Sequence, residues 1–106
     1  MATGRLGTAD LAAATETTLY TCPADTFSAV SVSICNRGNA AIAVRIAVSA
    51  TETPTLAEYI EFDAELLPKG VLERTGIVMG DGENIVVRSS SPNVSAMAFG
   101  IETPTN

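Results

Sequence analysis

The 106-residue sequence contains no histidine and no tryptophan. Without histidine the chain lacks the commonest general base and the commonest nitrogen ligand for metals, which excludes Ser-His-Asp and Cys-His catalytic arrangements. The two cysteines, Cys22 and Cys35, have no C-x-x-C partner, so we expect no zinc site. We therefore predict no catalytic, cofactor-binding or metal-binding residues and no cofactor, and we expect a protein that is not an enzyme.

Basic residues are also scarce. Lys69 is the only lysine, and the net charge is -6. Nucleic-acid binding needs clustered lysine and arginine, and anionic membranes attract the same residues. We therefore expect neither nucleic acid nor a membrane as a partner. Charged residues make up only 17% of the chain and hydrophobic residues 46%, a balance that favours an oligomer or a docked subunit.

The chain has no apolar run long enough to cross a bilayer. Its first residues lack the charged-then-apolar layout of a secretion signal, so we expect synthesis and folding in a cytoplasm. In that compartment Cys22 and Cys35 are expected to be free, buried thiols. A predicted hairpin of residues 18–22 with 28–36 would also hold them too far apart for a disulfide.

A strict alternation of apolar and small residues is the strongest positive signal. Val30, Val32 and Ile34 alternate with small residues, and the same pattern resumes from Ile42 to Val48 after a turn. A period of two indicates β-strands with one buried face. Turn residues separate seven strand candidates, at residues 17–22, 29–36, 41–49, 58–63, 71–79, 84–89 and 94–101.

Many short strands at this spacing predict an all-β fold, an antiparallel β-sandwich or jelly roll of about seven or eight strands. We divide the chain into an extended N-terminal arm (1–16), the β-sandwich domain (17–102) and a C-terminal tail (103–106). The arm is rich in small residues and lacks a period, and we expect it to contact a neighbouring protomer or the larger structure on which the protein docks.

The first two alternating segments are predicted to form a hairpin in which Ile34 pairs with Ile42. The face opposite the apolar one is then small and almost uncharged, with Ala29, Ser31, Ser33 and Cys35 on one strand. Two interpretations remain open for it. It is either an exposed face with little decoration, or a face covered by a second sheet or another subunit.

Three groups of polar residues are candidate sites. Tyr59, Glu61 and Asp63 share one strand face by alternation, and paired carboxylates can hydrolyse glycosides, although a solvated strand face is the simpler interpretation. The Gly80-Asp81-Gly82-Glu83 segment offers oxygens to a cation, or is an acidic turn. The mid-strand charges are expected to form structural or intersubunit salt bridges; these residues are Arg45, Glu73, Arg74 and Arg88.

Several strand segments together resemble small virion structural proteins of tailed bacteriophages, especially those of marine and cyanobacterial phages. The segments are SICNR (33–37), AVRIAVS (43–49), EYIEFD (58–63), VLERTGI (71–77), NIVVRSS (84–90) and NVS (93–95). The resemblance covers most of the chain after about residue 17 and rests on strand and turn patterns rather than on reactive groups.

Among such proteins, this size and all-β character are typical of head decoration, or cement, proteins. The resemblance implies a homotrimer on the capsid exterior, at local threefold positions, where it binds the major capsid protein and stabilises the shell. Assembly would take place in the host cytoplasm. The alternative is a β-module of the tail, baseplate or fibre that binds another virion protein or a host glycan.

Overall fold

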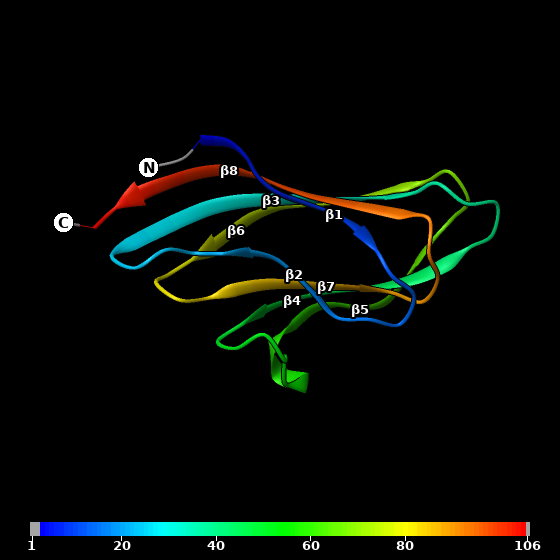
Figure 1. Ribbon diagram of the computed structural model, residues 1–106, viewed down its shortest axis with the longest axis horizontal. Helices are drawn as coiled ribbons and strands as arrows, with labels where there is room; N and C mark the ends of the chain where they lie inside the picture. Colours follow the sequence, from blue (N-terminus) through cyan, green and yellow to red (C-terminus); the bar gives the residue numbers. More distant parts are fainter. Residues whose placement is uncertain (1–2, 106) are drawn as a thin grey trace.

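The computed structural model describes residues 3–105 and consists of two antiparallel four-stranded sheets packed face to face (Figure 1). Sheet A has the strand order β1-β8-β3-β6, and sheet B has the order β2-β7-β4-β5. The strands are β1 (Thr3–Leu11), β2 (Thr17–Thr21), β3 (Thr26–Asn36), β4 (Ile42–Ser49), β5 (Tyr59–Leu66), β6 (Val71–Met79), β7 (Asn84–Ser89) and β8 (Val94–Pro104). A short 3-10 helix, η1 (Leu56–Glu58), precedes β5. The predicted all-β sandwich is confirmed.

The strands pair in a nested order. The first pairs with the last (β1 with β8), the second with the seventh (β2 with β7), β3 with β6, and β4 with β5. The chain is therefore a long antiparallel ribbon folded at its middle and wrapped so that successive strand pairs alternate between the sheets. Further pairs, β3 with β8 and β4 with β7, complete the two sheets. This is the jelly-roll arrangement.

The core lies between the sheets and has the composition that the alternation predicts. Val32, Ile34, Val44 and Ile46 have no exposed surface, and Val30 is 1% exposed. Each points inward because its two neighbours along the strand point to the outer face of the same sheet. The predicted apolar faces of both segments are confirmed.

The predicted partners of these segments are wrong. Ile34 pairs with Leu72 of β6 and Ala96 of β8, whereas Ile42 pairs with Leu66 of β5. The turn after β3 carries the chain from sheet A to sheet B, so β3 and β4 belong to different layers. The hairpin expected between residues 18–22 and 28–36 is wrong for the same reason, since β2 pairs with β7. Alternation specifies which face of a strand is buried, but not its neighbour.

The small face of β3 lies on the outside of sheet A. Ala29, Ser31, Ser33 and Cys35 are half-buried there, while sheet B covers the opposite side of the strand. The interpretation that a second sheet covers this face is therefore wrong. Coverage by another subunit stays a prediction.

The sheets extend beyond residues 17–102 at both ends. Within the expected arm, Thr3–Leu11 forms the edge strand β1 of sheet A, and Leu11 is 2% exposed in the core. Within the expected tail, β8 continues to Pro104. Residues 1, 2 and 106 of the expected arm and tail lie outside the described residues. In the part that the structure describes, no helix has the length and apolar character of a membrane span.

Candidate functional site

A β-bulge in β5 faces Arg45 on the outer side of sheet B. Val44 pairs with Ala64 and Ile46 pairs with Glu61, so the single residue Arg45 faces two residues of β5, Phe62 and Asp63. Asp63 has a φ of 54°, a left-handed conformation that aspartate tolerates better than most residues. A bulge of this kind re-aims side chains and interrupts the alternation of the strand.

The bulge surrounds the Arg45 guanidinium with a carboxylate and an aromatic ring. Nε donates to Oδ1 of Asp63 at 2.7 Å, and Nη2 donates to Oδ2 at 3.2 Å. The guanidinium carbon lies 4.1 Å from the centroid of the Phe62 ring, which meets the Tyr59 ring edge to face at 5.1 Å. Hydrogen bonding with Asp63 raises the pKa of Arg45, and the same contact lowers the pKa of Asp63. Both groups stay charged, and the cation is held in one position.

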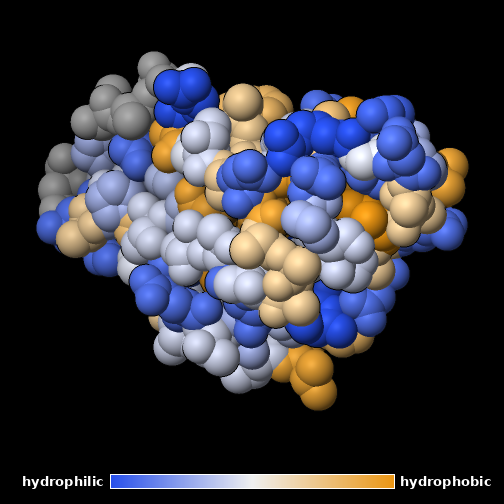
Figure 2. All heavy atoms as spheres, turned by 45° about the vertical axis from the view of Figure 1, so that its right-hand side comes forward, coloured by the Kyte–Doolittle hydropathy of each residue, from blue (hydrophilic) through white to orange (hydrophobic). Residues whose placement is uncertain are grey.

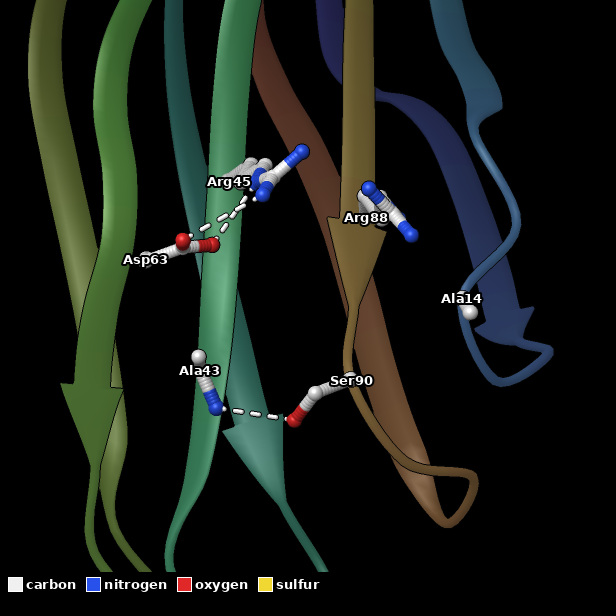
Figure 3. A pocket seen from close by; sticks show the side chains of 6 residues that line it. All are labelled: Ala14, Ala43, Arg45, Asp63, Arg88 and Ser90. Carbon is white, nitrogen blue, oxygen red and sulfur yellow. Dashed lines mark hydrogen bonds and ion pairs between the residues drawn. The ribbon is translucent and has the colours of Figure 1, made fainter.

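Arg88 of β7 is the direct cross-strand neighbour of Arg45. Two like charges opposite each other on one sheet face repel. Asp63 neutralises Arg45, but no side chain within residues 3–105 forms a hydrogen bond or ion pair with the Arg88 guanidinium. In Figure 3 the Arg88 side chain lies between Arg45 and Ala14, with no interaction drawn to it.

A cavity of about 150 Å³ opens beside the two arginines. Its other walls are Asp63 and three small residues, Ala14, Ala43 and Ser90. Backbone bonds fix these walls, because the Ala14 amide donates to the carbonyl of Ser89 at 2.8 Å. The Ala43 amide donates to Oγ of Ser90 at 3.0 Å, as Figure 3 shows. Because Ala14, Ala43 and Ser90 are small, the cavity stays open beside the side chains of Arg45 and Arg88.

Of the three residues expected to share a face of β5, Tyr59 and Asp63 lie together beside Arg45 on the outer face of sheet B, whereas Glu61 points to the other side. Glu61 accepts a hydrogen bond of 2.9 Å from Nη1 of Arg74, which belongs to β6 in the other sheet. Asp63 lies over β4 with Arg45, and the Tyr59 hydroxyl donates to Glu16 at 2.9 Å. The two carboxylates thus neutralise different arginines. A general acid needs a raised pKa, and the pKa of Asp63 is lowered.

The acidic turn 80–83 holds loops together. The Glu83 carboxylate accepts a hydrogen bond of 2.7 Å from the Gly80 amide, and Asp81 accepts one of 3.2 Å from the Asp25 amide. These contacts tie the turn after β6 to the turn after β2. Within the described residues, no group of three or more histidine, cysteine, aspartate or glutamate side chains is placed to hold a metal ion.

The adjacent mid-strand charges Glu73 and Arg74 point to opposite sides of β6. Glu73 pairs with Ser33 on the outer face of sheet A. Arg74 is its neighbour in sequence and forms its ion pair with Glu61 at the edge of the sandwich. Of the salt bridges predicted for these charges, those of Arg45 and Arg74 form within the described residues, and none forms there for Glu73 or Arg88.

A buried polar cluster between the sheets was not anticipated. The Tyr20 hydroxyl donates to Oε2 of Glu102 at 2.6 Å and lies 2.7 Å from Oγ of Ser28. The thiol of Cys22 lies 3.2 Å from the same Ser28 oxygen. Burial is the main reason that the pKa of Tyr20 is raised, and Glu102 adds to it. The sequence does indicate that Glu102 is buried. It lies an even number of residues after Ala96 and Ala98, so alternation along β8 points it to the same inner side.

The cysteines lie at different depths. Cys22 is 1% exposed within this cluster, whereas Cys35 is half-buried on the outer face of sheet A. Both are free thiols. Cys22 therefore fits the expected buried thiol, while Cys35 is more accessible than expected.

No protein-family model matches the sequence, and no curated protein matches it. The aromatic pair of β5 is a poor platform for a sugar, because one face of Phe62 is covered by Arg45 and its other neighbour is Tyr59.

Proposed function

We propose that this protein is a non-enzymatic structural protein of a virus particle, which decorates and stabilises the icosahedral capsid of a tailed bacteriophage. In this proposal it is a homotrimer at local threefold positions on the capsid exterior, bound to the major capsid protein after assembly in the host cytoplasm. The phage-like strand segments support this role. Jelly rolls also recur in viral capsid domains, which is an analogy of fold alone.

The observation that carries the proposal is an apolar strip on the outer face of sheet A. Ala29 of β3 pairs on one side with Val78 of β6 and on the other with Ile101 of β8. Val78 is 70% exposed and Ile101 is 51% exposed, and Phe27, two residues before Ala29, is 43% exposed. Four neighbouring apolar residues on three strands form a surface typical of protein contacts.

An exposed apolar residue also lies far from the strip. Leu56 of η1 is 82% exposed, and Figure 2 shows hydrophobic surface at the lower tip of the molecule, where Figure 1 places η1. Elsewhere on the face in Figure 2, hydrophobic and charged groups are intermixed. A lattice protein needs more than one contact surface, and many weak contacts on a symmetric shell add up to firm attachment.

The decisive measurement is the copy number per particle, determined by quantitative mass spectrometry of purified virions. A decorated icosahedral lattice predicts on the order of hundreds of copies. A few to tens of copies would place the protein on the tail, the baseplate or a unique vertex. Absence from the particles would contradict a virion role altogether.

The role of the strip is tested by substituting Val78→Asp. A charge in the middle of an apolar contact opposes association but leaves the domain folded, because Val78 points to solvent. Sedimentation of the free protein reports the trimer, and co-sedimentation with shells reports docking. Val71→Asp is the matched control, since Val71 lies on the same strand and face but pairs with Cys35, away from the strip. Equal effects of the two substitutions, or none, would contradict a role for the strip.

A further inference from the structure

The pocket beside Arg88 retains a positive charge that no side chain within residues 3–105 binds directly, although Asp63 attracts it at longer range. Arg45 and Arg88 contribute two cations, and Asp63 contributes one anion that is already bound to Arg45. One net positive charge remains in a cavity of about 150 Å³. Arg5 also has no ion-pair partner among residues 3–105, but it is exposed on the edge strand β1, whereas Arg88 is half-buried between neighbouring strands.

Apart from the Asp63 carboxylate, which is bound to Arg45, the hydrogen-bonding side chains of the pocket can donate. The Arg88 guanidinium carries five N–H groups, and none of them is used within the described residues. Arg45 uses Nε and Nη2 for Asp63 and also interacts with Tyr59, so Arg88 is the main donor of the pocket. The Ser90 hydroxyl accepts from the Ala43 amide, so its own hydrogen is available for donation. Such a set of donors is suited to an oxygen-bearing anion.

The charge and shape of the pocket select among such anions. A planar guanidinium binds a planar carboxylate through two parallel hydrogen bonds. One negative charge would neutralise the pocket. A phosphate dianion would instead leave one uncompensated negative charge beside the ionised Asp63. We propose that the pocket formed by Arg88, Arg45 and Ser90 is a binding site for a carboxylate group. This site is independent of the capsid role proposed above.

A carboxylate can come from a small free acid or from an acidic side chain of a partner protein. The test is a titration of the ¹⁵N-labelled protein at constant ionic strength, followed by NMR signals of the Arg88 Nε–H group and the Ala14 and Ala43 amides. Acetate is one probe. A capped tripeptide with a central glutamate is the second, with the central-glutamine peptide as its control, and inorganic phosphate is the comparator.

We expect saturable shifts with acetate or with the glutamate peptide, and weaker binding of the glutamine peptide and phosphate. Tighter binding of the glutamate peptide than of acetate would identify a protein side chain as the natural source, and the reverse would identify a free acid. Arg88→Gln is expected to weaken carboxylate binding by about tenfold or more, because a charge-assisted bidentate contact is lost. Arg5→Gln, on the other sheet, is expected to leave it unchanged.

Two results would overturn the proposal. One is a linear, non-saturating response that chloride reproduces, which would show a solvated arginine with no site. The other is carboxylate binding of equal affinity in Arg88→Gln and in the unmodified chain, provided that the amide spectrum of Arg88→Gln shows a folded domain. Substitution at this outer-face position leaves the core residues in place, so we expect that spectrum to stay dispersed.

Discussion

The hydroxyl of Tyr59 donates a 2.9 Å hydrogen bond to Glu16, and this single contact spans the outer face of sheet B. Tyr59 belongs to β5 and Glu16 directly precedes β2, and these are the opposite edges of the sheet. Between them, Ala47 pairs with both Tyr59 and Val86. Ala47 and Val86 are 0% and 1% exposed although they point away from the core. The bridge therefore lies along a row of small and apolar side chains.

Removing the bridge is expected to weaken the fold slightly. Tyr59→Phe deletes the donor and keeps the ring, so we expect a loss of about 0.5–1.5 kcal/mol in the free energy of unfolding. Glu16→Ala is expected to cost a similar amount, and the double variant less than the two losses combined. Urea denaturation measures all three. Fully additive losses would show that the two residues do not act together.

The two tyrosines are expected to resist ionisation in the folded state. The pKa of Tyr20 and that of Tyr59 are both raised, mainly because burial disfavours the phenolate and also because Glu102 and Glu16 add negative charge. The neutral phenols therefore stabilise the fold fully below the usual pKa of 10.0, and this contribution is lost as the pH rises above it. Absorbance titration is simple here because the chain has no tryptophan.

The expected titration shows less phenolate at pH 10 in the native protein than in urea. Tyr20→Phe is expected to remove the larger part of the alkaline loss of stability. A native protein in which both phenols ionise at the unfolded value would contradict the buried position of Tyr20.

Glu58 is expected to make the η1 loop sensitive to acid. Its carboxylate accepts hydrogen bonds from the Thr55 and Ala50 amides and from the Ser49 hydroxyl. These bonds lower its pKa from 4.5 to about 2, with the Thr55 backbone bond as the largest cause. The loop is thus stabilised above pH 4.5, and this stabilisation is lost as the pH falls toward 2.

Hydrogen exchange of the Thr55 and Ala50 amides measures this effect. We expect faster exchange on acidification, after correction for the intrinsic rate, and equally fast exchange at neutral pH in Glu58→Gln. Glu52→Gln, in the same loop, provides the control. If Glu58→Gln keeps both amides protected, the carboxylate does not hold the loop.

Adjacent residues of β3 point to opposite faces of sheet A, so the same substitution is expected to have opposite effects on folding at Val32 and at Ser33. Val32→Asp is expected to prevent folding, because burying an unpaired carboxylate costs several kcal/mol against a total stability of about 5–15 kcal/mol. Val32 has no exposed surface. Ser33→Asp places the same group on the half-buried outer face and is expected to leave the domain folded. Circular dichroism and thermal unfolding distinguish the two. A folded Val32→Asp variant would mean that the faces are reversed.

Local pattern was enough to locate most strands. The predicted bounds of β6 and β7 agree with the structure, because glycine and proline turns delimit both. The left-handed residues Asp25, Lys69 and Asn93 also lie in predicted turns. Strand β1 was not identified as a strand, since its glycine-rich and threonine-rich sequence has no alternation, and pairing with β8 organises it instead.

The pocket shows what local pattern omits. Arg45 and Arg88 stood out in the sequence as charges within strands, but their direct pairing depends on β4 and β7 being neighbours. The position of Asp63, on the opposite side of β5 from Glu61, depends on a bulge that the spacing does not reveal. Ala14 reaches the site only through the connection from β1 to β2. Each of these is a long-range property.

The nested strand pairs also imply an order of assembly. The β4–β5 pair closes a short loop, whereas β1 cannot pair with Val94 and the rest of β8 until almost the whole chain is present. Loop closure costs more entropy as the loop lengthens. We therefore expect strand pairing to begin with β4 and β5 and to proceed to the outer pairs, with β1 joining the sheet last. Pulse-labelled hydrogen exchange would then protect β4 and β5 before β1. During synthesis both edges of β3 stay unpaired until first β6 and then β8 have been made. We therefore expect misassembly to begin at this exposed strand.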